Sequence, residues 1–181
     1  MYRAGFIQGK GFEEIVSDTV NAVLDRLDRL GIAYRLAEHA PAHTMADCAG
    51  VDEALGALTV KNIFLTTRHT EQYYLCITRP DARFRAADIS RQAGSSRLSF
   101  APEAKLYELL RCHGGSASPL GLMFTDRVRL IVDRALRDAP TLAFHPCDNT
   151  RTVAMAGRDF FDVFLPSLGI APIDVEVHDL I

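Results

Sequence analysis

Hydrophobic residues recur along the chain with two different spacings, and these spacings predict a mixture of helices and strands. Between residues 12 and 30, valine and leucine occupy positions three and four apart, and Gly31 follows them. That pattern is typical of an amphipathic helix that ends at a glycine. We also expect helices over 45–55, 86–93, 102–111 and 158–168, and β-rich runs predict strands over 32–38, 58–67, 72–78, 97–100, 128–132, 141–144, 152–155 and 173–177.

The β-rich runs at 58–67 and 72–78 are separated only by residues 68–71, which predicts a β-hairpin. Residues 112–121 are rich in glycine and contain a proline, so we expect no regular structure there. No internal repeat, low-complexity tract or linker interrupts the chain. Helices and strands therefore alternate through what we expect to be one α+β domain over residues 1–181.

Lys61 and Asn62 lie side by side inside the apolar, β-branched run at 58–65, and Lys61 is one of only three lysines. If both faces of this strand are covered, an unpaired ammonium there is costly unless an anion compensates it. Lys61 is therefore a candidate for binding a charged ligand. The alternative is that Lys61 lies near the start of the strand and its amine reaches solvent along its own methylenes.

The composition is that of a globular protein with a substantial core, at 48% hydrophobic and 24% charged residues. No apolar stretch approaches the length of a membrane-spanning helix, and residues 1–6 lack the basic-then-apolar order of a signal peptide, so we expect a cytoplasmic protein. The four cysteines form no Cys-x-x-Cys pair, and the His39-x-x-x-His43 spacing falls in a polar turn that contains Pro41. We therefore expect reduced thiols and no metal site.

The net charge of −3 removes the simplest argument for binding long nucleic-acid duplexes. A smaller basic footprint is compatible with the sequence, because five arginines fall between residues 79 and 97 and could form a basic rim around a site. The alternative for each of them is an ordinary solvated surface. Both interpretations stay open at this stage.

Two further segments could contribute to chemistry. The loop at 114–121 consists mostly of small residues whose backbone amides can approach a ligand, although it has neither Walker nor dinucleotide-binding spacing. Residues 144–150 end a predicted strand with His145 and continue into a turn with an aspartate and Asn149. His145 can exchange hydrogen bonds near neutral pH, or it is simply a half-buried side chain. Ser116 and Cys147 have no neighbouring base that would make either one a convincing nucleophile.

Four motifs, taken together, resemble the YbaK/prolyl-tRNA-synthetase-associated editing domains, and most nearly their freestanding ProX or PrdX branch. The resemblance covers roughly residues 32–177. Its motifs occur in the family's order and read Val60-Lys61-Asn62-Ile63-Phe64-Leu65, Arg97-Leu98-Ser99-Phe100-Ala101, Gly115-Ser116-Ala117-Ser118-Pro119-Leu120-Gly121-Leu122 and Phe144-His145-Pro146-x-x-Asn149. The chain departs from the family at Arg111, where glycine is frequent, at Leu120, and at 124–126.

The resemblance implies an α+β fold with a central mixed, mainly antiparallel sheet surrounded by helices, and deacylation of mischarged alanyl-tRNA(Pro) in trans, without a cofactor. Its partners would be the 3′ acceptor end of the tRNA and, further, prolyl-tRNA synthetase or an elongation factor. The family's key lysine corresponds to Lys61. The positions that line the family's pocket correspond to Asn62, Gly115, Ser116, Ser118, Pro119, Leu120, Gly121, His145 and Asn149.

In the mechanism that the resemblance implies, Lys61 binds the terminal phosphate or the ester region, and amides of the loop cradle the carbonyl. The substrate's own ribose hydroxyl assists proton transfer, and His145 shapes the pocket without acting as a general base. Two alternatives stay open. One is a deacylase for a tRNA mischarged with serine, threonine or cysteine, and the other is a noncatalytic module that binds nucleic acid or protein.

Overall fold

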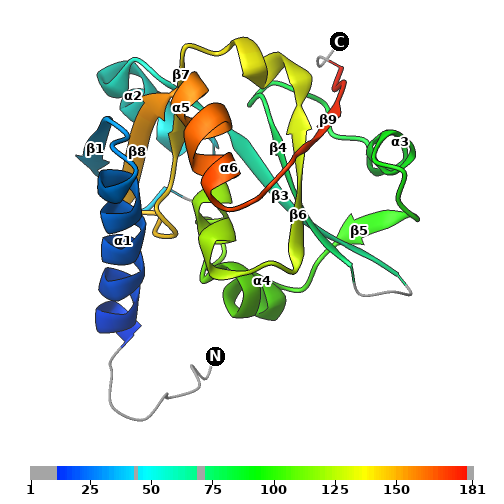
Figure 1. Ribbon diagram of the computed structural model, residues 1–181, viewed down its shortest axis with the longest axis horizontal. Helices are drawn as coiled ribbons and strands as arrows, with labels where there is room; N and C mark the ends of the chain where they lie inside the picture. Colours follow the sequence, from blue (N-terminus) through cyan, green and yellow to red (C-terminus); the bar gives the residue numbers. More distant parts are fainter. Residues whose placement is uncertain (1–11, 43–44, 69–71, 179–181) are drawn as a thin grey trace.

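The computed structural model describes residues 12–42, 45–68 and 72–178, although not the side chains of Phe12 and residues 45–49. Figure 1 shows strands in the middle of the molecule with helices around them. The helices are α1 (Phe12–Arg29), α2 (Met45–Leu55), α3 (Ala86–Gln92), α4 (Glu103–Leu110), α5 (Gly157–Asp159) and α6 (Leu165–Ser167). The strands are β1 (Tyr34–Glu38), β2 (Leu58–Thr59), β3 (Lys61–Thr67), β4 (Tyr73–Thr78), β5 (Leu98–Phe100), β6 (Val128–Asp133), β7 (Thr141–Phe144), β8 (Arg151–Ala156) and β9 (Ile173–Val175).

The strands form two sheets where the sequence led us to expect one. The first sheet has the order β1-β8-β7-β2, and the second has the order β5-β3-β4-β6-β9. Both are mixed, because β2–β7, β4–β6 and β6–β9 are parallel and the other four pairs are antiparallel. The α+β class is confirmed, and the expected hairpin is β3 paired with β4. Its turn, at residues 69–71, lies outside the described residues.

The predicted strand at 58–67 divides at Val60 into β2 and β3, which belong to different sheets. Thr59 still pairs with Ala143 of β7, and Val60 donates its amide to the Ala143 carbonyl at 3.4 Å. One residue later Lys61 pairs with Thr78 of β4. The chain therefore crosses between sheets within one residue, which an unbroken apolar run cannot reveal.

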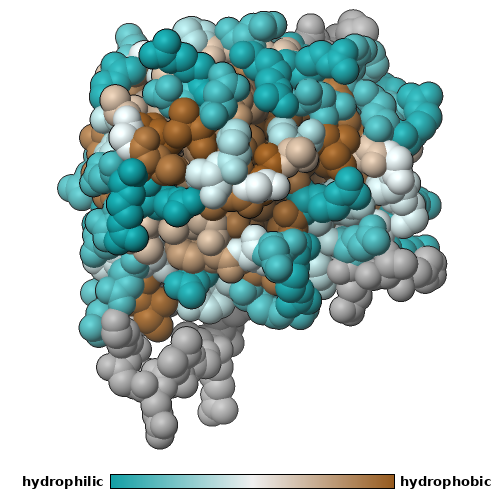
Figure 2. All heavy atoms as spheres, in the orientation of Figure 1, coloured by the Kyte–Doolittle hydropathy of each residue, from teal (hydrophilic) through white to brown (hydrophobic). Residues whose placement is uncertain are grey.

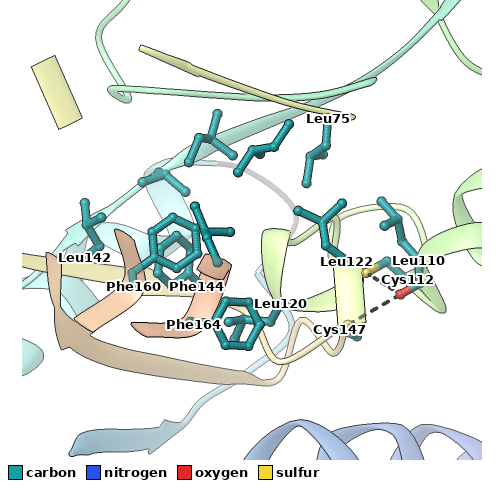
Figure 3. Close-up of a cluster of buried hydrophobic side chains, with 14 of the residues drawn as sticks. Leu75, Leu110, Cys112, Leu120, Leu122, Leu142, Phe144, Cys147, Phe160 and Phe164 are labelled. Carbon is teal, nitrogen blue, oxygen red and sulfur yellow. Dashed lines mark hydrogen bonds between the residues drawn. The ribbon is translucent and has the colours of Figure 1, made fainter. Parts of the chain in front are cut away.

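Most buried side chains belong to one hydrophobic cluster, here called the first cluster, which includes Phe64, Leu75, Leu120, Phe144 and Phe164. Figure 3 shows the aromatic rings of Phe144, Phe160 and Phe164 together at its centre. A second cluster on the other face of the second sheet packs α3 through Ile89 and includes Ile63, Leu65 and Leu98. Figure 2 shows hydrophilic residues over much of the viewed surface, with hydrophobic residues in smaller patches between them.

Two segments carry more helix than the sequence predicted. Residues expected to be irregular form a 3-10 helix at Pro119–Phe124, because the Ser118 hydroxyl accepts a hydrogen bond from the Leu120 amide and caps it. A second 3-10 helix, Arg134–Asp138, was not predicted. The helix expected at 158–168 is continuous, with a π-helical stretch at Phe160–Phe164 between α5 and α6. In the described residues, no helix combines the length and apolarity needed to span a membrane.

Candidate functional site

Lys61 lies where the two sheets meet, at the first residue of β3, and it is half-buried. Side chains alternate along this segment, so Thr59 and Lys61 share one face while Val60 and Asn62 share the other. The pairing with β7 ends just before Lys61, with Thr59 opposite Ala143 and the Val60 amide bonded to the Ala143 carbonyl. No described residue forms a hydrogen bond or an ion pair with the Lys61 ammonium. Lys61 is therefore a half-buried cation close to the end of β7.

Asn62 points to the opposite face from Lys61, and its side-chain amide is only half satisfied. Its Nδ2 donates to the Val60 carbonyl at 3.2 Å, whereas its Oδ1 is buried and accepts no hydrogen bond. A buried acceptor without a donor is uncommon in folded proteins and costs stability. The Asn62 Oδ1 is thus a candidate acceptor for a donor on a ligand.

His145 follows β7, is 8% exposed and belongs to a chain of hydrogen bonds on the α2 side of the first sheet. Its Nδ1 lies 2.8 Å from the Arg151 carbonyl and 3.4 Å from Thr152 Oγ1. Thr152 Oγ1 lies 2.8 Å from Nε2 of His39, whose Nδ1 lies 2.8 Å from the Ala40 carbonyl. Because carbonyls only accept, both Nδ1 atoms carry the proton when the rings are neutral. Thr152 then donates to His39.

This arrangement fixes what His145 can do in the site. Burial lowers the pKa of His145 below the ordinary value of 6.5, so the ring is neutral at physiological pH. Since Nδ1 is committed to the Arg151 carbonyl, the lone pair lies on Nε2. His145 is therefore a positioned hydrogen-bond acceptor rather than a cation. The expectation that it shapes a pocket without acting as the general base stays a prediction.

The loop at 113–121 uses several of its polar groups to hold its own shape. The Ser116 hydroxyl accepts from the His113 amide at 2.8 Å and donates to the His113 carbonyl at 3.1 Å. The amides of Ser116, Leu120 and Gly121 donate within the loop, to the His113 carbonyl, Ser118 Oγ and the Ser118 carbonyl respectively. Within the described chain, the amides still without an acceptor are those of Gly115, Ala117 and Ser118. Only these three remain for a ligand carbonyl.

Leu120 and Gly121 have packing roles that the sequence did not suggest. The Leu120 side chain is fully buried in the first cluster, and Figure 3 shows it next to Phe164. A Cβ at Gly121 would lie 2.5 Å from the Leu110 carbonyl oxygen, so the loop touches the end of α4 at this glycine. Pro119 is also buried, at the start of the 3-10 helix. These residues pack the loop against the core, and their side chains are not available to contact a substrate from solvent.

The turn at 145–149 connects the loop to the rest of the site. Leu110 at the end of α4 accepts hydrogen bonds from the thiols of Cys112 and Cys147, at 3.3 and 3.6 Å, as Figure 3 shows. On its other side, the Asn149 carbonyl accepts from the Ala42 amide at 2.9 Å, and Asn149 Nδ2 donates to the Ala42 carbonyl at 3.4 Å. Asn149 therefore fastens the turn to the chain after β1, and the Cys147 thiol connects the turn to the end of α4.

The cysteines of this region are unsuited to nucleophilic chemistry. Cys112 and Cys147 are buried, and their mutual hydrogen bond, followed by burial, raises the pKa of the Cys147 thiol well above its ordinary value. Burial raises the pKa of Cys76 to about 12. Thiols with raised pKa values are poor nucleophiles at neutral pH. Among the residues that the structure describes, no three histidine, cysteine or carboxylate side chains are grouped as metal ligands.

Four residues of the site were not singled out from the sequence. They are His39, Asp52, Thr59 and Thr152. Thr59 donates a hydrogen bond to the Asp52 carboxylate of α2, which fastens α2 beside the crossover. Thr152 and His39 orient His145. All four act through pairings between distant parts of the chain, so no local pattern marks them.

Comparison with known proteins gives an independent line of evidence. A family model described as the aminoacyl-tRNA editing domain matches residues 39–163. The curated protein "Prolyl-tRNA editing protein ProX" of Acetoanaerobium sticklandii is 33% identical over 144 residues, which span 78% of this chain and 88% of that protein. "Prolyl-tRNA synthetase associated domain-containing protein 1" of Bos taurus is 30% identical over 157 residues, 84% of this chain and 91% of that protein.

Solved structures share the fold at lower sequence identity. The hypothetical protein APE2540 superposes with a TM-score of 0.69 at 18% identity, over 86% of this chain and 97% of that one. A structure described as a candidate trans-editing enzyme for prolyl tRNA synthetase superposes with a TM-score of 0.68 at 16% identity, over 90% and 98%. At these identities the likeness concerns the fold alone.

Proposed function

The chain belongs to the aminoacyl-tRNA editing domain family, and from this premise we propose that it hydrolyses the ester bond of mischarged alanyl-tRNA(Pro) in trans. The observation that carries the proposal is the sheet crossover at Val60. It places Lys61 at the junction of the two sheets, where no described residue pairs with its ammonium. A half-buried cation without such a partner fits an anionic ligand.

The 3′ end of the tRNA carries such an anion in its terminal phosphate. We propose that Lys61 binds the phosphate or ester region of the terminal nucleotide, while Asn62, on the opposite face of β3, donates to the Val60 carbonyl at the crossover. His145 Nε2 accepts from a ribose hydroxyl, because its lone pair is fixed there by the Nδ1 bond to Arg151. The terminal adenosine would then lie over the turn at 145–149, with Lys61 on one side and the loop on the other.

The reaction needs only water and the groups already present. Water attacks the ester carbonyl, and the free amides of Gly115, Ala117 and Ser118 are the donors available to the developing oxyanion. The ester C–O bond breaks, the ribose oxygen leaves with a proton, and alanine and tRNA are released. No covalent enzyme intermediate forms, which agrees with the buried, high-pKa thiol of Cys147.

Selectivity against proline is a steric matter. Forcing extra methylenes into a closely packed site costs roughly 1 to 3 kcal/mol, or about 5- to 150-fold in rate. A site that fits alanine therefore excludes the larger prolyl group of correctly charged tRNA better than it could reject a smaller aminoacyl group. In this chain the loop at 113–121 is held in place because Leu120 and Gly121 pack it against the core.

The test is deacylation of alanyl-, seryl-, threonyl-, cysteinyl- and prolyl-tRNA by the purified protein. We expect rapid release of alanine from alanyl-tRNA(Pro) and slow release of proline from prolyl-tRNA(Pro). Faster release of serine, threonine or cysteine than of alanine would assign the protein to another editing reaction. If none of these esters is hydrolysed above the rate without protein, the chain is a binding module and the proposal fails.

A further inference from the structure

A groove rich in arginine lies between α3, β5 and the end of β3. Its volume is about 630 Å³. Two alanines and Leu98 complete a lining whose polar members are Arg68, Ser90, Arg91, Ser95, Arg97 and Ser99. The mechanism proposed above uses none of these residues.

The charge of this groove is opposite to that of the whole chain. Within the part of the chain that the structure describes, three arginines and no carboxylate line it, in a protein with a net charge of −3. All three arginines are exposed. Among the described residues, the carboxylate paired with one of them is Asp88, which lies 3.2 Å from Arg91, and both side chains of that pair are solvent-accessible. An exposed pair of this kind contributes little energy, so Arg91 can exchange Asp88 for another anion.

The wall between the arginines is rigid. The Ser90 hydroxyl donates to the Ala86 carbonyl at 2.6 Å and accepts from the Leu98 amide at 3.0 Å, which ties β5 to α3. The Ser95 amide donates to the Ser90 carbonyl at 3.0 Å and closes the connection between them. The helix, the strand and their connection therefore hold Arg91 and Arg97 at the two sides of a fixed groove.

An exposed aromatic ring lies next to the groove. Phe100 is 74% exposed although it follows directly after the groove residue Ser99. Its ring packs at 6.1 Å, tilted by 45°, against Phe84, which precedes α3. Arg83 and Arg85 flank Phe84 in sequence and are exposed. Basic side chains interleaved with an exposed aromatic ring are typical of surfaces that bind single-stranded or terminal nucleotides.

β3 connects this surface to the candidate catalytic lysine. Lys61, Ile63, Leu65 and Thr67 share one face of the strand, and on that face Leu65 pairs with Phe100 and Thr67 with Leu98. Arg68 follows Thr67 directly. At about 3.3 Å per residue, Lys61 and Arg68 are separated by roughly 23 Å along the strand. Lys61 and Phe100 thus lie on the side of the second sheet that α3 packs against, and Arg68 and Arg97 directly adjoin the paired ends of β3 and β5.

We propose that this groove, with Phe100 beside it, binds the sugar–phosphate backbone of the acceptor arm of a tRNA whose 3′ end reaches Lys61. The proposal rests on the proposed function for the direction of the RNA, but the groove's RNA affinity does not require hydrolysis. Guanidinium groups in a fixed groove match phosphates, which they bind in a bidentate manner. An acidic peptide would also be attracted by the arginines, but it would give Phe100 no base to stack on.

The experiment measures binding of uncharged tRNA(Pro) by fluorescence anisotropy at 50 and 200 mM salt. The test variant carries Arg68→Gln, Arg91→Gln and Arg97→Gln. The matched control carries Arg29→Gln, Arg127→Gln and Arg158→Gln, which removes the same charge from exposed arginines outside the groove. Each lost phosphate contact reduces the slope of log affinity against log salt concentration by about 0.7 to 0.9. If the variant lacks three contacts, the affinity of the wild type should fall roughly 20- to 40-fold more than that of the variant between 50 and 200 mM salt.

We expect the groove variant to lose this salt dependence and the control variant to keep it. We also expect Phe100→Ala to weaken binding by about tenfold, since removing one stacked base has an effect of that order. A groove variant that binds tRNA with the wild-type affinity and salt slope would overturn the proposal, whatever the enzyme hydrolyses. Conversely, groove-dependent binding by a protein that deacylates nothing would support this inference and refute the proposed function.

Discussion

Replacement of Gly121 by alanine tests how the loop is held against the core. A Cβ at Gly121 would lie 2.5 Å from the Leu110 carbonyl oxygen, 3.1 Å from Leu110 Cβ and 3.2 Å from the Cys112 sulfur. The first distance is far shorter than van der Waals contact, and the obstacle is backbone at the end of α4, so the loop must move. Overpacking of this kind costs about 1 to 3 kcal/mol. For a chain of this size, that lowers Tm by roughly 2 to 12 °C.

The displacement should also reach the site. Leu110, against which the new methyl group would press, holds the thiols of Cys112 and Cys147 through the same carbonyl oxygen. Both the loop and the turn at 145–149 would therefore shift. Misplacement of binding groups by an ångström costs up to about 100-fold in rate, so we expect kcat/KM for alanyl-tRNA(Pro) to fall by about 10- to 100-fold.

Gly50→Ala is the matched control. Gly50 lies within α2, and a Cβ there would meet no atom within 4 Å. Alanine in a helix interior is favoured over glycine by about 0.5 to 1 kcal/mol, so this variant should have a slightly raised Tm. The assays are urea and thermal unfolding together with deacylation. If Gly121→Ala is as stable as Gly50→Ala, the described packing of the loop against α4 is wrong.

Three further predictions concern protonation, thiols and backbone strain. Burial lowers the pKa of His145 below 6.5 in the folded state, so the unfolded state takes up a proton first as pH falls. The contribution of His145 to the free energy of unfolding should therefore be complete above about pH 7 and decline below about pH 6.5. His145→Asn should flatten that decline in urea titrations, and an unchanged slope would contradict the assignment. Cys147→Ser should retain activity, and a chelator should leave the rate unaltered; loss on chelation that one divalent ion restores would refute the water-and-backbone mechanism. Arg111 has φ 54° and stacks 4.5 Å over Phe124, so Arg111→Gly should be more stable than Arg111→Ala by about 1 to 2 kcal/mol, and equal stabilities would exclude strain there.

The elements themselves could be predicted from the sequence because they depend on local patterns. The helix predicted over 45–55 is α2, and the strand predicted over 141–144 is β7. Arg111 shows how a departure from the family becomes intelligible only in the structure. It occupies a left-handed position at the end of α4, where glycine is favoured, and the ring of Phe124 packs on its guanidinium.

The site was only partly predictable, because its geometry comes from pairings between distant strands. Lys61 was identified by a local feature, a rare lysine in an apolar run. Its position next to the end of β7 follows from the parallel pairing of β2 with β7, and neither sequence contains a sign of that register. The hydrogen bonds that Thr152 forms with His39 and His145 depend on the same long-range packing. The assignment of Lys61, Asn62 and the loop to substrate binding stays a prediction.

The central claim is that Lys61 contributes its charge to hydrolysis of alanyl-tRNA(Pro). The most direct measurement is single-turnover deacylation of alanyl-tRNA(Pro) by Lys61→Ala, compared with Lys105→Ala, which removes an α4 lysine paired with Glu108. We predict that Lys61→Ala reduces kcat/KM by at least about tenfold, or about 1.4 kcal/mol of transition-state stabilisation, while Lys105→Ala stays near wild type. Wild-type activity in a folded Lys61→Ala protein would contradict the account.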